Sequence, residues 1–390
     1  MKSEKEADPA LARVHRLLRS VPLTDGHNDL AWRIRTAGTP PGDVAAYDLR
    51  QRTPGHTDLA RLAEGRVGAQ FWAAFLPGDL EGGRFARVLL EQIDIIRQVI
   101  ARYPDRLGLA LSADDIEREF KRGRIASLIG LEGGHGIENS LGVLRACHAL
   151  GARYLTLTHN VTTDWADAAL GARRHGGLTA FGREVVREMN RLGMLVDLSH
   201  TSPETMSAAL DVTRAPVIIS HAGARALVDH PRNVPDEILR RVRENGGIVM
   251  VTFVPPFVSA QAAAFEQRRE AEEKRLSASV ADAAGRRRAL EAWDAANPRP
   301  CATLAQVADH IQRVRDVAGA DHVGIGSDFD GIDHVPVGLE DVSKFPDLLA
   351  ELARRGWSDE DLAKLAGGNV LRVLRAAEAA AAGPPATAGG

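Results

Sequence analysis

Histidines and carboxylates stand at the ends of several short apolar segments in this chain. His27 and Asp29 follow the first such segment. Their spacing of two on an extended chain lets both side chains bind one ion, although, taken alone, the pair is better explained by a turn in which Asp29 caps a helix. Glu132 ends an apolar segment before two glycines. A carboxylate buried there is costly unless it bridges two cations, and a place at a helix N-terminus is the alternative.

Two further histidines, His200 and His221, each end an apolar segment directly after a serine. A single histidine at such a position is more often a packed or capping residue, but two at matching positions of consecutive segments favour a pair of ligands. Asp328 follows Gly-Ile-Gly-Ser, and the glycines allow the backbone to approach a ligand closely. Beside a metal-bound water, Asp328 would be the natural proton acceptor, whereas its alternative is the start of a turn.

Together these residues predict a site for two metal ions. Two ions about 3.5–4 Å apart can share a hydroxide and polarise a carbonyl, which is the pattern of metal-assisted hydrolysis. Nitrogen and carboxylate-oxygen ligands suit zinc and also admit manganese or cobalt. The first ion would be bound by His27, Asp29 and Glu132, and the second by Glu132, His200 and His221.

Apolar segments alternate with amphipathic helices along the chain, which predicts parallel βαβ units. Eight such units close into a (β/α)8 TIM barrel, where all the carboxyl ends of the strands meet on one face. A doubly wound open sheet is the alternative, but no G-x-G-x-x-G follows the first strand. The expected strands are 21–25, 67–76, 125–131, 154–158, 194–198, 217–220, 248–254 and 322–327, and the expected helices are 85–103, 141–150, 179–192, 203–212, 235–244 and 304–317.

Three segments complete the expected domain organisation. Residues 259–296 are rich in Ala, Arg and Glu, and we expect a solvated helical insertion after the seventh strand, with a lid or a partner surface as the alternative. Residues 357–376 are expected to form C-terminal helices on the barrel. We therefore expect a single barrel domain over 1–376 and a disordered tail over 377–390.

Composition excludes several classes of protein. A net charge of −3 argues against a nucleic-acid partner. Two cysteines, Cys147 and Cys301, are too few for a disulfide framework. Since no apolar run reaches the roughly 18 residues of a membrane span, and the N-terminal residues lack the apolar core of a secretory signal, we expect a soluble, cytoplasmic protein without membrane contact.

Eight motifs in this order resemble the membrane (renal) dipeptidase family of the amidohydrolase superfamily, and the resemblance runs from about residue 20 to residue 375. The motifs are Asp-Gly-His-Asn-Asp at 25–29, Leu-Glu-Gly-Gly-His at 131–135, Leu-Thr-His-Asn at 157–160, Asp-Leu-Ser-His at 197–200, Ser-His at 220–221, His-Pro-Arg-Asn-Val-Pro-Asp at 230–236, Gly-Ser-Asp-Phe-Asp-Gly at 326–331 and Gly-Gly-Asn-Val-Leu-Arg at 367–372.

The resemblance implies a binuclear zinc dipeptidase on a (β/α)8 barrel, with the five metal ligands named above. It also implies that His159 contacts the substrate and steadies the oxyanion, and that Arg232 pairs with the terminal carboxylate of the substrate. Asp328 would take a proton from the bridging hydroxide and later pass one to the leaving amine. The implied substrates are L-Xaa-L-Xaa and L-Xaa-D-Xaa dipeptides, and the implied assembly is a homodimer.

The sequence departs from the family pattern in two respects. It has neither the secretory signal nor the cysteines of the mammalian members, so it resembles the bacterial cytoplasmic branch. Thr252 and Pro256 differ from the residues that bacterial relatives tend to have, which affects the expected preference for substrate side chains.

His135 is a possible partner of a ligand. The alternative functions are hydrolysis of an N-acyl-amino acid, lactone or β-lactam on the same metals, or a metal-free barrel that binds peptides.

Overall fold

The computed structural model describes residues 8–37, 40, 42–80 and 82–382. Eight parallel strands form a closed ring, because β2 pairs with β1 on one edge and with β4 on the other. The predicted (β/α)8 barrel is therefore confirmed. Its strands are β1 (Leu23–Asn28), β2 (Val67–Phe75), β4 (Ile125–Glu132), β5 (Ala152–Thr156), β6 (Leu195–Asp197), β7 (Ile218–Ala222), β8 (Ile248–Val251) and β9 (Val323–Ile325).

A ninth strand, β3 (Leu107–Leu109), was not predicted. It pairs with the first half of β4, whereas β5 pairs with the second half. β3 thus lengthens the sheet beside the barrel without joining the ring. The other eight strands were predictable because both of their faces are buried, so that their sequences are nearly continuous apolar runs.

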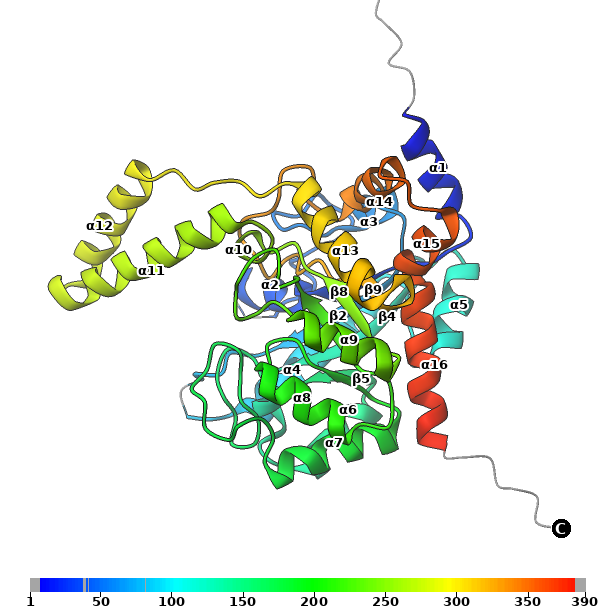
Figure 1. The fold of residues 1–390 in the computed structure, drawn as a ribbon, viewed down its shortest axis with the longest axis horizontal. Coiled ribbons are helices and arrows are strands. Elements are labelled where there is room, and N and C mark those ends of the chain that lie inside the picture. Colours follow the sequence, from blue (N-terminus) through cyan, green and yellow to red (C-terminus); the bar gives the residue numbers. More distant parts are fainter. Residues whose placement is uncertain (1–7, 38–39, 41, 81, 383–390) are drawn as a thin grey trace, which may run out of the picture.

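The helices cover the outside of the barrel (Figure 1). Those expected from periodicity are observed within two residues of the expected ends. These are α4 (Phe85–Arg102), α6 (Leu141–Ala149), α7 (Ala180–Leu192), α8 (Pro203–Val212), α9 (Asp236–Asn245) and α13 (Leu304–Ala318). The remaining helices of this layer are α1 (Pro9–Leu17), α2 (Leu30–Ala37), α3 (Leu59–Glu64), α5 (Ala113–Lys121) and α14 (Phe345–Arg354), with short turns η1 (Gly134–Ile137), η2 (Ala320–His322) and η3 (Val342–Lys344).

The predicted insertion after the seventh barrel strand is helical. It contains α11 (Ala260–Ser279) and α12 (Ala283–Ala296), and the short helix α10 (Pro255–Val258) precedes it. In Figure 1, α11 and α12 form a hairpin that extends away from the barrel. Phe265 packs against Trp293 with ring centroids 5.6 Å apart, and Arg269 pairs with Asp294 at 2.9 Å. These contacts hold the hairpin together.

The C-terminal helices are α15 (Asp359–Ala363), a π-helical turn η4 (Lys364–Gly368) and α16 (Asn369–Ala382). Because α16 runs to Ala382, residues 377–382 are helical, contrary to the expected disorder. Alanine has the highest helix propensity, Ala377 is buried, and Glu378 accepts a hydrogen bond from Ala113 N at 2.9 Å. Residues 383–390, the rest of the expected tail, lie outside the described residues.

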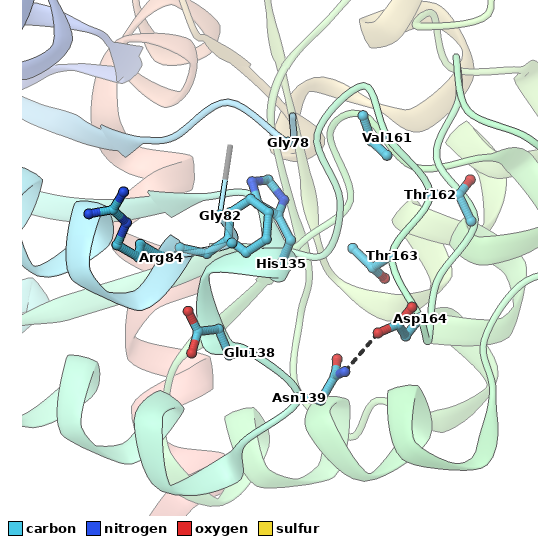
Figure 2. A pocket seen from close by; sticks show the side chains of 12 residues that line it. Gly78, Gly82, Arg84, His135, Glu138, Asn139, Val161, Thr162, Thr163 and Asp164 are labelled. Atoms are coloured by element: carbon cyan, nitrogen blue, oxygen red, sulfur yellow. Dashed lines mark hydrogen bonds between the residues drawn. The ribbon is translucent and has the colours of Figure 1, made fainter. Parts of the chain in front are cut away.

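Loops at the carboxyl ends of β2, β4 and β5 enclose a surface cavity of about 660 Å³ (Figure 2). Its lining includes Arg84, His135, Glu138 and Asp164.

None of the helices in the described part of the chain combines the length and apolar character that a bilayer crossing requires.

Candidate active site

All of the predicted site residues lie at the carboxyl face of the barrel. Six of them line a second cavity of about 200 Å³, and His27 and His221 lie beneath it within 3.5 Å of Glu132. The six are Asp29, Glu132, His159, His200, Arg232 and Asp328. The barrel thus brings together residues that are up to 301 positions apart, as expected for the face on which TIM-barrel enzymes place their active sites.

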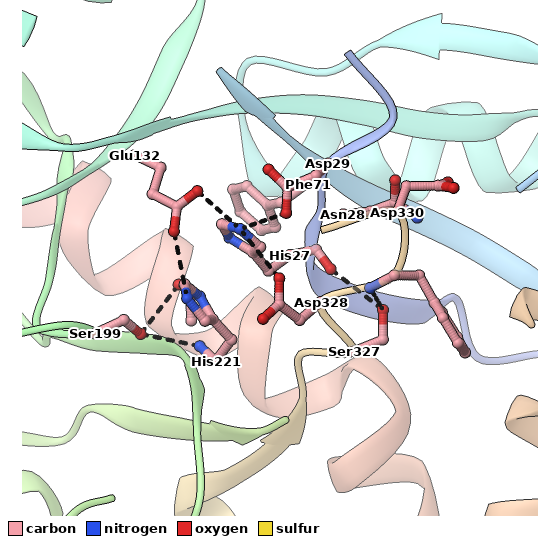
Figure 3. A network of polar contacts seen from close by, with 12 residues as sticks. His27, Asn28, Asp29, Phe71, Glu132, Ser199, His221, Ser327, Asp328 and Asp330 are labelled. Carbon is pink, nitrogen blue, oxygen red and sulfur yellow. Dashed lines mark hydrogen bonds and ion pairs between the residues drawn. The ribbon is translucent and has the colours of Figure 1, made fainter. Parts of the chain in front are cut away.

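Glu132 lies at the centre of this cluster (Figure 3), and its two oxygens face different histidines. Oε2 lies 3.3 Å from Nε2 of His27, which is also 3.3 Å from Oδ2 of Asp29. Oε1 lies 3.0 Å from Nε2 of His200 and 3.5 Å from Nε2 of His221. The carboxylate therefore connects two groups of potential ligands.

The three histidines are oriented by hydrogen bonds on their other nitrogen. Nδ1 of His27 lies 2.9 Å from the Tyr154 hydroxyl, which donates to the Gly26 carbonyl and so accepts from the ring. Nδ1 of His200 lies 3.0 Å from Oδ1 of Asn160, and Nδ1 of His221 lies 2.8 Å from Oγ of Ser220. A proton on Nδ1 of each ring would leave Nε2, the nitrogen nearer to Glu132, with a lone pair for a metal ion. This is the arrangement that metal-ligating histidines adopt.

The donor set fits divalent cations. Three overlapping trios of ligand atoms each lie within 4.8 Å of one another: His27–Glu132–His221, Glu132–His159–His200 and His27–Asp29–Asp328. Among the described residues, Nε2 of His27 and Oδ1 of Asp29 are buried without a hydrogen-bond partner. Since an unpaired buried polar atom is costly, bound cations would satisfy atoms that the protein leaves unpaired.

Two of the site residues have a strained backbone. His200 and Asp328 have φ angles of 63° and 67°, in the left-handed region. Such conformations cost on the order of 1–3 kcal/mol each and are concentrated at functional sites. Each residue stands three positions after the last residue of its strand, β6 or β9, and both line the 200 Å³ cavity.

Burial and charge shift the protonation equilibria of the cluster. Burial acts to raise the pKa of Glu132, but the surrounding histidines outweigh it and hold this pKa well below its ordinary value. Burial, with the neighbouring charges of Asp29 and Glu132, raises the pKa of Asp328 well above its ordinary value. Burial lowers the pKa of His159 to about 4, so its imidazole is neutral at pH 7.

Residues 11–387 match the model of the membrane dipeptidase family, peptidase family M19. The chain belongs to this family. It is 42% identical over 382 residues to Dipeptidase verJ of Clonostachys rogersoniana, covering 95% of this chain and 88% of that protein. It is also 42% identical over 370 residues to Dipeptidase 3 of Rattus norvegicus, covering 93% of this chain and 66% of that protein. The resemblance seen in the motifs is thereby confirmed, and the protein is a metal-dependent dipeptidase.

Solved structures share its fold. The probable dipeptidase PvdM from Pseudomonas aeruginosa superposes with a TM-score of 0.83 at 24% identity, over 95% of this chain and 99% of that chain. A metallopeptidase from Rhodobacter sphaeroides, liganded with a phosphinate mimic of L-Ala-D-Ala, superposes with a TM-score of 0.75 at 24% identity, over 92% and 99% of the two chains.

Arg232 supplies a positive charge at one side of the dipeptidase cavity. Its side chain is buried, and Nη2 donates to the His221 carbonyl at 3.3 Å. Nε and Nη1 are buried and have no partner among the described residues. Burial lowers the pKa of Arg232 to about 10, which leaves it charged at neutral pH. Arg232 therefore lines the cavity as a charged side chain with two donors that have no partner among the described residues.

Other residues of the dipeptidase site were not predicted as functional. Tyr154 and Asn160 are hydrogen-bond partners of His27 and His200, and Trp32 and Phe75 form an apolar wall of the cavity, with their ring centroids 5.0 Å apart. A tyrosine within an otherwise apolar strand is a detectable signal, because a buried hydroxyl usually has a partner.

His135, a suggested partner of a ligand, instead faces the larger cavity of Figure 2. Its Nε2 lies 3.2 Å from the Leu76 carbonyl, and its ring packs edge-on against Phe85. Its hydrogen bond within the described structure is thus to the backbone and not to a proposed ligand.

Proposed function

We propose that this dipeptidase binds two divalent ions, zinc in preference to manganese or cobalt, and hydrolyses dipeptides with a free C-terminal carboxylate. The first ion would be held by His27, Asp29 and Glu132, and the second by Glu132, His200 and His221. The observation that carries the proposal is the position of Glu132, whose two oxygens each lie within 3.3 Å of a different histidine Nε2. A carboxylate that bridges two ions must offer one oxygen to each ion.

When bound, the two ions would supply Lewis acidity to the scissile carbonyl and lower the pKa of a water molecule at the centre. Asp328 would take a proton from the attacking water and transfer it to the leaving amine. Its Oδ1 lies 4.0 Å from Nε2 of His27, on the same side as Asp29. A raised pKa suits this role, because the carboxylate must both accept and release a proton.

His159 is proposed to donate a hydrogen bond to the developing oxyanion. Its ring centroid lies 4.4 Å from that of His200 and 4.9 Å from that of Phe75, so the ring is held at the edge of the cavity. Since its pKa of about 4 leaves it neutral at pH 7, it carries one N–H donor that would stabilise negative charge on the substrate.

Arg232 is proposed to bind the terminal carboxylate of the dipeptide. A guanidinium complements a carboxylate in charge, and Nε and Nη1 of Arg232 have no hydrogen-bond partner among the described residues. This contact places the C-terminal residue beside Val254 and Phe257 and leaves the N-terminal residue for the side of Trp32 and Phe75. We include dipeptides with a D-residue at the C-terminus, since the related Rhodobacter protein was solved with a mimic of L-Ala-D-Ala.

Metal stoichiometry tests the bridging role of Glu132. Wild-type protein loaded with zinc and dialysed should retain two ions per chain. Glu132→Gln should weaken the binding of both ions, because Glu132 contacts both groups of ligands. His221→Asn should weaken the binding of one ion. Retention of one ion at wild-type affinity in Glu132→Gln, or fewer than two ions in the saturated wild type, would contradict the proposal.

A further inference from the structure

Two buried aspartates outside the proposed ligand set occupy corresponding places in the barrel. Asp25 lies on β1 and Asp197 at the end of β6, the first and fifth of the eight strands in the ring. Both side chains are fully buried, with 0% exposure. Neither lines the substrate cavity. A buried carboxylate is costly unless it is fully hydrogen-bonded, so the partners of these two groups indicate what they do.

Asp25 accepts four hydrogen bonds from three neighbouring segments. Its Oδ1 accepts from the backbone N–H of Ser327 at 2.7 Å and of His27 at 3.3 Å. Its Oδ2 accepts from Oγ of Ser327 at 2.7 Å and from Nε2 of Gln70 at 3.0 Å. The carboxylate thus joins β1 to β2 on one side and to the residues after β9 on the other.

Asp197 repeats this pattern oxygen by oxygen. Its Oδ1 accepts from the backbone N–H of Ser220 at 2.9 Å and of Ser199 at 3.1 Å. Its Oδ2 accepts from Oγ of Ser220 at 2.7 Å and from Oγ1 of Thr156 at 2.5 Å. In each case one serine donates both its backbone N–H and its hydroxyl to the aspartate. The other two donors are the backbone N–H of the residue two positions after the aspartate and one side chain from the strand on the opposite side.

The serine in each pattern stands directly before a proposed site residue. Because the Ser220 hydroxyl gives its proton to Asp197, its oxygen is free to accept from Nδ1 of His221, which lies 2.8 Å away. That acceptor keeps the proton on Nδ1 and leaves the Nε2 lone pair of His221 for a metal ion. Asp197 therefore acts on His221 through Ser220.

On the other side of the barrel, Ser327 precedes Asp328. The hydroxyl oxygen of Ser327 lies 3.2 Å from the His27 carbonyl oxygen. The backbone N–H of Asp328 donates to the same carbonyl at 3.1 Å. Asp25 binds both Ser327 and the N–H of His27. It therefore connects the end of β1, which carries His27, with the residues after β9, which include Asp328.

We propose that Asp25 and Asp197 are paired positioning residues, each of which prepares one of the two metal sites. Asp197 would set, through Ser220, the metal affinity of the site at His200 and His221. Asp25 would set the metal affinity of the site at His27 and Asp29. This inference rests on the proposed binding of two ions.

Zinc affinities of the full-length protein, measured by chelator competition, test the assignment. In Asp197→Asn the amide nitrogen opposes the Ser220 hydroxyl, so the hydroxyl proton turns toward His221, and one ion should bind about 10–100-fold more weakly, the usual effect of losing a partner of a ligand. Asp25→Asn should weaken the other ion by a similar factor. The matched control is Asp167→Asn, a buried carboxylate that accepts from the backbone of Arg174, His175 and Gly177, and it should retain both affinities.

Double variants that contain His221→Asn identify which ion is affected. In His221→Asn, where one site is already weakened, adding Asp197→Asn should cause no further loss, whereas adding Asp25→Asn should weaken the remaining ion. Should Asp197→Asn fail to fold, Ser220→Ala removes the same acceptor from His221 and should show the same selective loss. Ser327→Ala serves in the same way for Asp25.

Three results would overturn the inference while leaving the binuclear site intact: unchanged affinities in both aspartate variants, equal weakening of both ions by each variant, or the same weakening by Asp167→Asn. Fewer than two ions in the wild type would overturn the binuclear proposal and this inference with it.

Discussion

The guanidinium of Arg232 lies over the ring of Phe257, with 5.3 Å between its central carbon and the ring centroid. Stacking of this kind holds the planar group in one orientation. Nη2 donates to the His221 carbonyl, while Nε and Nη1 have no partners among the described residues, so the charge of Arg232 is not neutralised by a carboxylate hydrogen-bonded to it.

Replacement of Arg232 should therefore affect substrates according to their C-terminus. Loss of a buried partner of a charged group costs about 2 kcal/mol or more, so Arg232→Ala should lower kcat/KM for a dipeptide at least about 30-fold, by the relation of about 1.4 kcal/mol per factor of ten. The same dipeptide with a C-terminal amide should lose little. Parallel kinetics on the two substrates measure the difference, and equal losses would rule out the carboxylate contact.

Asp328→Asn tests proton transfer. The amide preserves the shape of the side chain but does not accept a proton at neutral pH, so kcat should fall by a factor on the order of 10²–10⁴, the usual contribution of a general base. Metal content should stay at the wild-type level, because Asp328 is not among the proposed ligands. Full activity in this variant would remove Asp328 from the mechanism.

Gly331 lies where no side chain fits. A Cβ at this position would stand 2.3 Å from Oδ2 of Asp29 and 2.7 Å from Oδ1 of Asp328. Gly331→Ala should therefore displace one or both carboxylates and lower zinc affinity and activity together. Gly142→Ala is the control, since its Cβ would meet its nearest neighbour at an ordinary 3.4 Å. Wild-type zinc affinity in Gly331→Ala would show that the two carboxylates do not need their present positions.

Much of the barrel and its site was predictable from the sequence because burial and chemistry leave local signals. Strands buried on both faces are apolar runs, and a histidine or carboxylate at the end of such a run is conspicuous. β3 was not predicted although it is as long as β6 and β9, and unlike them it lies outside the ring and pairs with a single strand. Residues 377–382 were expected to be disordered, but their helix depends on tertiary contacts with α5 that a local pattern does not contain.

The partners of the ligands were harder to predict. Tyr154 is 127 positions from His27, and Asp25 is 302 positions from Ser327. Such pairings depend on which side chains face each other across the closed barrel, and this depends on the register of strands far apart in sequence. Asp25 and Asp197 stood inside the quoted motifs, but their role as hydrogen-bond acceptors became visible only in three dimensions.

The stability of the protein should fall on acidification partly because of His310. This side chain is 1% exposed and its Nδ1 accepts from Ala224 N at 2.9 Å. Burial lowers its pKa from 6.5 to about 4, so the unfolded state binds one more proton than the folded state between these values. The stabilisation is complete above pH 6.5 and is lost as pH falls toward 4.

Denaturant unfolding from pH 7 to pH 4 measures this effect. In His310→Asn, where Oδ1 can replace Nδ1 as acceptor, the slope of the unfolding free energy with pH should be smaller than in the wild type by up to about 1.4 kcal/mol per pH unit, the value for one proton. Identical slopes in the two proteins would show that His310 does not titrate on unfolding.

The most direct test of the proposed function is a hydrolysis screen of the zinc-loaded protein. The panel contains L-Xaa-L-Xaa and L-Xaa-D-Xaa dipeptides, with N-acyl-amino acids, lactones and β-lactams beside them. The proposed binuclear site and the charge of Arg232 predict rapid cleavage of a subset of the dipeptides, abolished in Glu132→Gln. Turnover of an N-acyl-amino acid or a lactone with no cleavage of any dipeptide would contradict the proposed substrate, even with both ions in place.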